Sequence, residues 1–183
     1  MDNPKNTETI TLAGGCFWCI EAVLKRLKGI VKLQSGYTGG KISNPTYKEV
    51  CSGLTGHAEA VLVEFDPEQI STDTLLTVFF TTHDPTTLNR QGADIGTQYR
   101  SAVYFHNEAQ KSVVLDFIAG LEKEGVFNSK IVTEVSPATV FYPAEDYHQN
   151  YYDQNREQNS YCTAVIDPKV NKLRKTFAHL LSA

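Results

Sequence analysis

The sequence predicts an α/β (α+β) fold: a two-layer sandwich with a mixed β-sheet, a ferredoxin-like core, long irregular loops and a C-terminal segment. Three observations lead to this expectation. Strand-like and helix-like stretches alternate along the chain, a helical crossover joins the first two strands, and later connections look antiparallel or long. Because Gly and Pro are dispersed and no repeat is visible, we expect residues 1–183 to form one domain.

The first elements follow from alternation and then from helical spacing. Residues 7–12 alternate Thr, Ile and Leu like a strand, which Ala13-Gly14-Gly15 ends. From Cys16 the apolar residues recur every three or four positions, as they do on the buried face of a helix. Gly29 stands where the residue after the helix end is expected, and residues 30–33 return to an extended pattern.

The middle of the chain begins with a long loop signal. Residues 35–56 are rich in Gly, Pro, Asn and Thr, which predicts an irregular surface loop, and loops often carry functional residues. Residues 61–65 alternate like a half-buried strand that ends at Asp66-Pro67. Ser71 is typical of an N-cap and predicts a helix whose apolar face includes residues 75–80.

The last elements are a strand, a helix, a short strand and a terminal helix. Residues 99–105 alternate as a strand, and Asn107 is expected to cap a helix that runs to about Glu124. Residues 131–135 form a short strand pattern. Asp167-Pro168 predicts the start of the terminal helix, since proline is favoured in the first turn.

Composition and charge disfavour several classes of function. The chain has 17 Lys and Arg against 21 Asp and Glu, a net charge of -4, without a block of like charges. We therefore expect no binding to nucleic acid or to an anionic membrane surface. The first ten residues lack an apolar leader, and no apolar run approaches the roughly 18 residues of a membrane span. A cytoplasmic, monomeric protein is expected.

Four cysteines in a chain without an export signal point to reduced thiols rather than structural disulfides. Cys16 stands where a strand ends and a helix begins. Because the N–H groups and dipole of a helix start favour an anion, we expect a lowered thiol pKa and a nucleophilic thiolate. The alternative is a buried and inert cysteine. Gly14-Gly15, which would allow a substrate to approach closely, favours the reactive thiol.

Cys19 follows Cys16 at the spacing of a Cys-x-x-Cys pair, which is typical of a thioredoxin-like redox site or of half a zinc site. Cys51 and Cys162 are isolated in sequence, so a four-ligand zinc site is not expected. The two residues between the thiols are aromatic, which is atypical of a plain thioredoxin pair. Phe17 and Trp18 fit instead the wall of an apolar pocket around the reacting sulfur.

Five blocks now stand in order along the chain: Gly15-Cys16-Phe17-Trp18, Gly36-Tyr-Thr-Gly-Gly40, Asn44-Pro-Thr-Tyr-Lys-Glu-Val50, Thr55-Gly-His-Ala-Glu-Ala60 and Gly96-Thr-Gln-Tyr-Arg-Ser101. Together they resemble the signature motifs of A-type peptide methionine sulfoxide reductases. The resemblance extends from about Ile10 into the last helix, and five ordered blocks are far more specific than one Cys-x-x-Cys pair. Enzymes of this class reduce one epimer of methionine sulfoxide.

The resemblance implies roles for the residues around the sulfoxide. Cys16 attacks the sulfoxide sulfur and becomes a sulfenic acid, and Glu59 is the acid that supplies a proton to the oxygen. An acid that works near neutrality must be held protonated, as an apolar pocket can do. Tyr47 and Tyr99 are implied to donate hydrogen bonds to the same oxygen. Each of these residues, taken alone, also fits an ordinary solvated or amphipathic side chain.

Three further residues are implied to complete the site. Phe17 and Trp18 receive the methyl group of the thioether, and Asp94 is an acidic residue that orders a water or a helix start. Fixing the methyl and the oxygen around a chiral sulfur admits one epimer, the S epimer by resemblance. No cofactor or metal is implied. The histidines at 57, 83 and 148 carry no ligand spacing, and we expect structural roles for them.

Turnover requires a second thiol that condenses with the sulfenic acid, and two candidates compete. Cys162 matches the resolving cysteine of relatives that carry it near the C-terminus, and Cys19 matches the resolving position of relatives with Gly-Cys-Phe-Trp-Cys. We rank Cys162 first, because the polar stretch 153–160 before it is expected to be mobile. Cys51 matches a position without a required redox role. Thioredoxin is the implied reductant.

Two other readings are weighed against the reduction of free or protein-bound methionine-S-sulfoxide. A thiol–disulfide oxidoreductase would act through Cys16 and Cys19 on protein disulfides, and it would reduce insulin without reducing sulfoxides. A zinc-binding interaction module would retain metal after purification. Both alternatives leave the Glu59, Tyr47 and Tyr99 blocks without a role.

Overall fold

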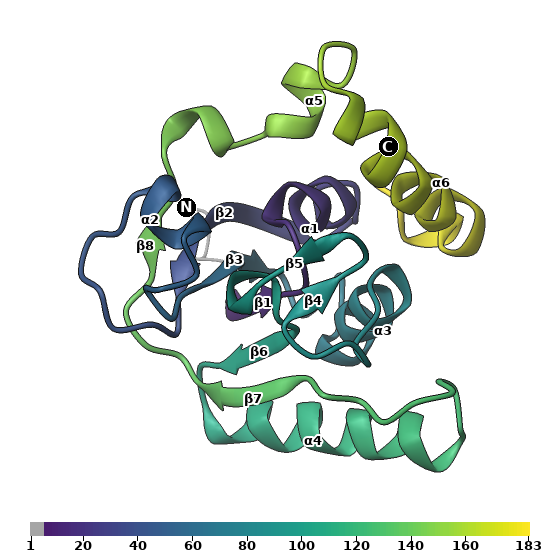
Figure 1. The fold of residues 1–183 in the computed structure, drawn as a ribbon. Helices are drawn as coiled ribbons and strands as arrows, with labels where there is room; N and C mark the ends of the chain where they lie inside the picture. The colour runs from purple at the N-terminus through teal and green to yellow at the C-terminus, as the bar shows by residue number, and fades with distance from the viewer. Residues whose placement is uncertain (1–5) are drawn as a thin grey trace.

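The computed structural model describes residues 6–183 and contains a six-stranded mixed sheet in the order β7-β6-β1-β3-β2-β8 (Figure 1). The strands are β1 (Glu8–Ala13), β2 (Ile30–Thr38), β3 (Ala58–Phe65), β6 (Ala102–Phe105), β7 (Glu134–Pro137) and β8 (Tyr142–Pro143), with β4 (Arg90–Gln91) and β5 (Asp94–Ile95) in a separate hairpin. The α-helices are α1 (Phe17–Leu24), α2 (Tyr47–Cys51), α3 (Thr72–Thr82), α4 (Glu108–Lys123), α5 (Tyr151–Asn155) and α6 (Asp167–Thr176). Shorter turns are η1 (Thr97–Tyr99), η2 (Asp146–His148) and η4 (Ala178–Leu180), and η3 (Cys162–Ile166) is a π-helix. The N-terminal stretch without an apolar leader falls partly on residues 1–5, outside the described residues.

Strand pairing confirms the expected mixed sheet. The β1 strand pairs antiparallel with both β3 and β6, β2 pairs antiparallel with β3 and β8, and β6 pairs parallel with β7. The register sets Glu59 of β3 opposite Tyr37 of β2. Glu59 therefore lies near the start of β3, a strand that has β1 on one side and β2 on the other.

The two faces of the sheet differ in the size of their side chains. One face carries branched and aromatic residues that join the main core with the helices: Ile10, Leu12, Val61, Val63, Phe65 and Val103. The other face carries the small residues Ala13, Ala58, Ala60 and Ala102 beside Tyr104, covered by Ala138 and Phe141. The helices pack on the first face, where most of the buried apolar residues lie.

Several helix boundaries agree with the sequence signals. Ser71 caps α3, with its hydroxyl accepting a hydrogen bond from Thr74 N at 3.1 Å. Asn107 caps α4 in the same way toward Gln110 N at 2.8 Å. Asp167 begins α6, with the following proline in the first turn. These caps satisfy backbone donors that a helix start leaves unpaired.

The first helix is shorter than expected, because the C-terminus pairs with the chain that follows it. The α1 helix ends at Leu24, and Leu27 forms a β-bridge with Leu181. Gly29 has φ of +88°, a conformation that favours glycine, but it closes a later turn and does not follow the helix end. The expectation of a helix that continues to Gly29 is therefore wrong.

The predicted loop over residues 35–56 contains two regular elements. The β2 strand continues to Thr38 because residues 36–38 pair with β3, and α2 begins after Thr46, whose hydroxyl accepts a hydrogen bond from Glu49 N at 3.2 Å. Two predicted strands start later than expected, at Ala102 and at Glu134. In both cases the residues before the strand do not pair in the sheet.

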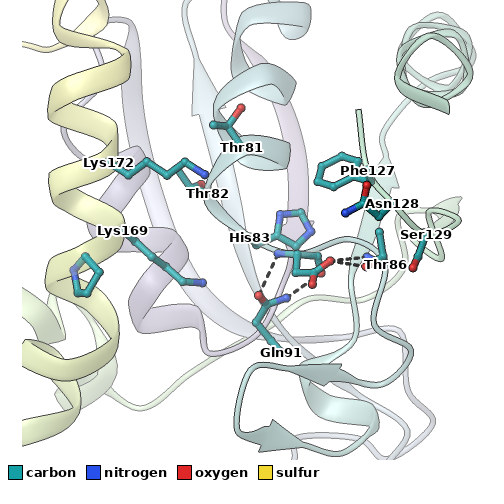
Figure 2. A pocket seen from close by; sticks show the side chains of 12 residues that line it. Thr81, Thr82, His83, Thr86, Gln91, Phe127, Asn128, Ser129, Lys169 and Lys172 are labelled. Carbon is teal, nitrogen blue, oxygen red and sulfur yellow. Dashed lines mark hydrogen bonds between the residues drawn. The ribbon is translucent and has the colours of Figure 1, made fainter. Parts of the chain in front are cut away.

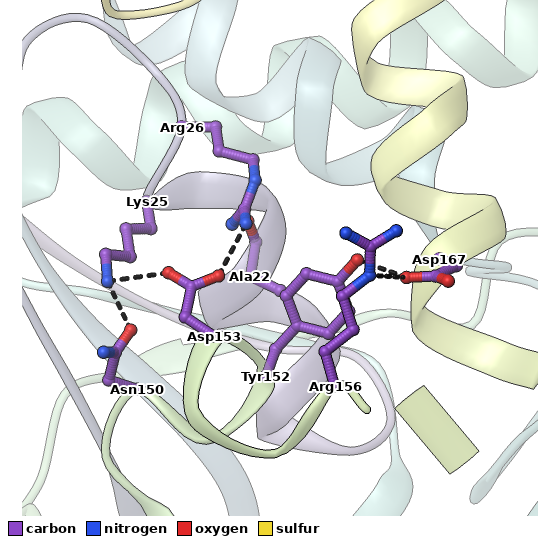
Figure 3. A network of polar contacts seen from close by, with 8 residues as sticks. All are labelled: Ala22, Lys25, Arg26, Asn150, Tyr152, Asp153, Arg156 and Asp167. Carbon is purple, nitrogen blue, oxygen red and sulfur yellow. Dashed lines mark hydrogen bonds and ion pairs between the residues drawn. The ribbon is translucent and has the colours of Figure 1, made fainter. Parts of the chain in front are cut away.

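The C-terminal stretch runs from β8, at one edge of the sheet, over α1 to α6 (Figure 1). Residues 153–160, expected to be a mobile arm, instead begin within α5 and are anchored by polar contacts (Figure 3). Asp153 accepts from Lys25 at 2.9 Å and from Arg26 at 2.6 Å, and Arg156 pairs with Asp167 at 3.0 Å. Within residues 6–183 no helix is both long and apolar enough to cross a bilayer.

Candidate active site

Cys16 caps the start of α1, with extended backbone angles, and its residue is 8% exposed. The two glycines before it are required by the protein's own packing. Gly15 has φ of +88°, and a Cβ there would lie 2.6 Å from Gln91. A Cβ on Gly14 would lie 2.8 Å from His83. The expectation that these glycines open space for a substrate is therefore wrong.

Glu59 lies beside this helix start, buried to 1% exposure. The backbone N–H of Phe17 donates to its Oε1 at 3.1 Å. Within residues 6–183, its buried Oε2 has no hydrogen-bond partner. Burial raises the pKa of Glu59 to about 8, although the Phe17 hydrogen bond acts in the opposite direction. The carboxyl is consequently protonated at neutral pH, the state required of a proton donor.

The Cys16 thiol also holds its proton. Burial raises the pKa of Cys16 well above that of a free thiol, and the hydrogen bond that it donates to Cys19 and the charge of Glu59 act in the same direction. We expected the helix start to lower this pKa. That expectation is wrong, because desolvation and the acidic neighbours raise the pKa of Cys16 more than the backbone hydrogen bond lowers it.

Cys19 is the more acidic thiol of the pair. It is 2% exposed, and its backbone N–H donates to Cys16 O at 3.0 Å. The hydrogen bond from the Cys16 thiol lowers the pKa of Cys19 against the effect of burial. The Tyr161 hydroxyl lies 3.8 Å from Cys19 Sγ. Cys162 is buried in η3, and Cys19 is, after burial, the group that most raises its pKa. The structure thus places Cys16, Cys19 and Cys162 in one core cluster, where the charge of Cys19 raises the pKa of both other thiols.

Tyr47 and Tyr99 reach the site from two short helical elements, α2 and η1. Burial, with the charge of Glu59 as a further cause, raises the pKa of each tyrosine above its ordinary value. Both hydroxyls therefore keep their protons and can donate. Tyr47 donates to the thiol of Cys51, which is exposed.

Phe17 and Trp18 belong to an aromatic cluster built around His148. Trp18 Nε1 donates to His148 Nδ1 at 3.1 Å, and the imidazole lies 5.2 Å from the Phe17 ring and 4.3 Å from that of Tyr47, between centroids. The indole stacks on Tyr151 at 3.7 Å with an angle of 6° between planes. These rings form an apolar cluster at the start of α1, and their role as a wall beside the reacting sulfur stays a prediction.

Asp94 lies on β5 and contacts the C-terminal stretch. It accepts a hydrogen bond from the Tyr161 hydroxyl at 2.6 Å, and Tyr161 meets Trp18 edge-on at 6.0 Å. We expected Asp94 to order a water or a helix start. Instead it holds a tyrosine that touches Cys19.

Sequence reasoning missed the contribution of the C-terminal stretch. His148, given a structural role, lies at the centre of the aromatic cluster, and Glu145 contacts the Tyr37 hydroxyl and the Tyr47 backbone N–H at 3.4 and 3.3 Å. The available signal was the density of Tyr, His and acidic residues from Tyr142 to Tyr152.

The other two histidines are structural. His57 accepts from Gly40 N at 3.0 Å, and His83 bonds Phe79 O and the Ser101 hydroxyl at 2.6 and 2.8 Å. Among residues 6–183, no three His, Cys, Asp or Glu side chains converge as metal ligands.

Comparisons with known proteins agree with this geometry. Residues 8–181 match the family model described as peptide methionine sulfoxide reductase. A relative from Chromobacterium violaceum, named peptide methionine sulfoxide reductase MsrA, is 53% identical over 174 residues, which are 95% of this chain and 98% of the relative.

Two solved structures are similar as well. Reduced Mxr1 from Saccharomyces cerevisiae is 36% identical with a TM-score of 0.78, covering 87% of this chain and 91% of Mxr1. A structure of Mxr1 in complex with Trx2 is 25% identical with a TM-score of 0.55, covering 82% of this chain and 88% of that one. With the family match over nearly its whole length, the chain belongs to the peptide methionine sulfoxide reductase family.

Proposed function

We propose that Cys16 carries out the methionine sulfoxide reduction that defines this family, with free or protein-bound methionine-S-sulfoxide as substrate. The observation that carries the proposal is the buried pair of Cys16 with a protonated Glu59. A sulfoxide oxygen is a poor leaving group until it is protonated. A carboxyl that keeps its proton up to about pH 8 supplies what the step lacks.

Glu59 carries out both proton transfers of the first step. It gives its proton to the sulfoxide oxygen as Cys16 attacks the sulfur, and the carboxylate so formed takes the thiol proton from Cys16, with which it is in contact. In the net step a thiol and a sulfoxide become a sulfenic acid and a thioether. The Cys16 sulfur is oxidised by two electrons and the substrate sulfur is reduced by two, so no free thiolate is needed beforehand.

Tyr47 and Tyr99 hold the oxygen, and Phe17 and Trp18 hold the methyl group. Both phenols keep their protons, as the Glu59 carboxyl does, so all three can donate to the oxygen as negative charge develops on it. The aromatic cluster offers the methyl an apolar surface. With two substituents of a chiral sulfur fixed, only one epimer presents its sulfur to Cys16.

Cys19 and Cys162 resolve the sulfenic acid, and we propose that they act in that order. The Cys16 and Cys19 thiols are already in contact, which supports Cys19 as the first to attack. The proximity of Cys162 to Cys19 supports a second exchange that yields a Cys19–Cys162 disulfide and frees Cys16. This order gives both candidates a role, and Cys162 forms the final disulfide in either case.

Thioredoxin is the proposed reductant of the final disulfide. The complex of the similar protein Mxr1 with Trx2 supports it. Asp94 enters this half of the cycle because it holds Tyr161, which precedes Cys162 in the chain. The thiol–disulfide oxidoreductase alternative is less well supported, because it leaves the residues gathered around Glu59 without a role.

The test is a mass-spectrometric assay with the two sulfoxide epimers of a short peptide and a dithiol. The S epimer is expected to be reduced and the R epimer to remain. The Cys16→Ser variant, checked by circular dichroism, is the control for chemical reduction by the dithiol. Equal rates on both epimers would contradict the arrangement of Tyr47, Tyr99, Phe17 and Trp18 described above.

We also propose the finer description of the fold, a two-layer sandwich around a ferredoxin-like core. The order β6-β1-β3-β2 with all neighbours antiparallel, and crossovers through α1 and α3, supports it. A single catalytic domain over residues 1–183 is supported by the bridge between Leu27 and Leu181. The monomeric state and the cytoplasmic location stay predictions, and size-exclusion chromatography checks the first.

A further inference from the structure

A cavity of about 550 Å³ opens between the end of α3 and the face of α6, away from Cys16. Its lining includes Thr82 and His83 on one side and Lys169 and Lys172 on the other. Figure 2 shows both lysines reaching from α6 across the cavity toward the end of α3. The proposed mechanism gives no role to either lysine.

A second, much smaller gap of about 10 Å³ lies behind this cavity. The two share Thr82, His83 and Lys169, but the smaller gap also reaches Gly14 and Cys19. Its volume is about that of one water molecule. Lys172 lines the outer cavity only. Lys169, together with Thr82 and His83, therefore lines both the open cavity and the smaller gap that reaches Cys19.

The charged and titratable groups near Cys19 come from several elements. Cys16 and Glu59 lie toward the helix start, and Tyr161 with Asp94 lies on the side of the C-terminal stretch, beside Cys162. His83, at the end of α3, is neutral, because burial lowers its pKa to about 4.

Among the residues that line the smaller gap, Lys169 is the only cation once His83 is neutral. Its positive charge is a further cause, after the Cys16 hydrogen bond, that lowers the pKa of Cys19. The Asp94 charge acts in the opposite direction. The charge of Lys169 therefore favours the Cys19 thiolate, whereas the charge of Asp94 disfavours it.

The first half-reaction changes this balance. The hydrogen bond that makes Cys19 acidic comes from the Cys16 thiol, and that thiol becomes a sulfenic acid on turnover. Lys169 is unchanged by the reaction, so its stabilising charge remains when Cys19 has to attack.

We propose that Lys169 is a positioning residue for the resolving step: from its place on α6 behind Cys19, its ammonium stabilises the Cys19 thiolate that attacks the Cys16 sulfenic acid. The inference rests on the proposed function. In this step the Cys19–Cys16 S–S bond forms, the S–O bond of Cys16 breaks, and hydroxide leaves and takes up a proton as water. The sulfoxide has already supplied the oxidising equivalents, so no other oxidant is required.

The experiment compares Lys169→Met and Lys169→Arg with Lys172→Met, a matched control on the same helix and cavity. Each full-length protein, fully reduced, is mixed with a peptide methionine-S-sulfoxide without external reductant between about pH 5 and pH 9. Acid-quenched samples are alkylated and analysed by mass spectrometry. One measurement follows methionine formation, and the other follows disulfide formation at Cys19, as the sum of the Cys16–Cys19 and Cys19–Cys162 disulfides.

Lys169→Met is expected to form methionine at the parent rate but to form the disulfide about fivefold to tenfold more slowly at neutral pH, with the midpoint of the pH profile raised by about one unit. At alkaline pH its rate should reach or exceed the parent rate, because the more basic thiolate is the better nucleophile. Lys169→Arg should keep the parent profile, and Lys172→Met should match it too. If Lys169→Met does not fold, Lys169→Gln is used with the same expectation.

Two results would overturn the inference: profiles for Lys169→Met and Lys172→Met that coincide, or a loss in Lys169→Met that is equal at every pH. A parent protein that forms no methionine would overturn the proposed function itself. The two failures are distinguishable, because methionine and the disulfide are measured in the same samples.

Discussion

Cys16 and Cys19 lie one helical turn apart, yet the surroundings of Cys16 favour a protonated thiol and those of Cys19 favour a thiolate. Cys16 faces Glu59, a buried acid that keeps its proton, and no cation is among the causes that shift its pKa. Cys19 faces Tyr161 and the charge of Lys169. Oxygen transfer requires groups that hold protons, and resolution requires a thiolate. The surroundings of the two thiols therefore suit the two proposed half-reactions, which have opposite proton requirements.

The comparison also explains why the simple rule for a cysteine at a helix start is insufficient. The rule predicts a low pKa at Cys16 from the backbone N–H groups. Here the backbone contribution is the smallest of the causes at Cys16, and desolvation is the largest. Burial depth and the nearest charges decide the protonation state, and neither can be read from a motif.

The largest expected effect is at the nucleophile. Cys16→Ser should abolish reduction of the S epimer while the protein stays folded, because a serine hydroxyl is a far weaker nucleophile than a cysteine sulfur. Peptide mass spectrometry measures methionine, and circular dichroism checks the fold. Residual turnover close to that of the parent would exclude Cys16 as the reacting group.

The next largest effect is expected at Glu59, the proposed acid beside Cys16. Glu59→Gln should slow methionine release by about 10²-fold or more, since an amide cannot donate a proton to the oxygen. Single-turnover rates, measured before any reductant is needed, check this. An unchanged rate would assign the proton transfer to another group.

The pH profile sharpens the same prediction. With a pKa of about 8, Glu59 is protonated below that pH and ionised above it, so parent methionine release should fall as pH rises through about 8. Glu59→Gln should lack this descending limb. A parent profile that stays flat into alkaline solution would contradict the assignment.

Substitution of either resolving cysteine is expected to slow the regeneration of Cys16 by thioredoxin. Cys162→Ser should reduce thioredoxin-supported turnover at least about tenfold, while one equivalent of methionine still forms and a Cys16–Cys19 disulfide accumulates. Cys19→Ser should have the smaller effect, with Cys162 attacking Cys16 directly. Peptide mapping after one turnover identifies the disulfides. Normal turnover by Cys162→Ser would reverse this order.

The smallest expected effects are at the tyrosines. Tyr47→Phe and Tyr99→Phe each remove one hydrogen bond of about 1 kcal/mol, so each should slow methionine release by about fivefold. Tyr142→Phe, which changes a tyrosine that packs on His57 outside the site, is the matched control. The variants should leave the recycling steps at parent rates. Equal losses in recycling would indicate general disruption.

Local signals predicted much of the fold. Ser71 and Asn107 cap helices as expected, because capping depends on residues within one turn. The end of α1 and the start of β6 were missed, because distant pairing decides them: Leu27 bridges Leu181, and β6 begins only where it can pair with β1. Contacts between residues so far apart in sequence leave no local pattern.

The site residues also divide into those that local motifs predict and those that only the tertiary structure brings in. Cys16, Glu59, Tyr47 and Tyr99 lie in short sequence motifs, and in the structure Glu59 lies beside the helix that begins after Cys16. His148 and Tyr151 join the site only because the C-terminal stretch folds back over α1. Their positions depend on the tertiary structure, so no local spacing along the chain singles them out.

Glu59 also has a thermodynamic consequence. Its pKa rises from 4.5 to about 8 on folding, so the folded protein keeps a proton that the unfolded chain releases between these values. Its contribution to the free energy of unfolding is therefore largest below about pH 4.5 and falls as pH rises toward 8. By neutral pH this contribution has fallen by about 3 kcal/mol. Glu59→Gln, which does not titrate, should gain melting temperature relative to the parent as pH increases. The raised pKa that suits Glu59 to its proposed role as an acid at neutral pH thus makes the folded state less stable there.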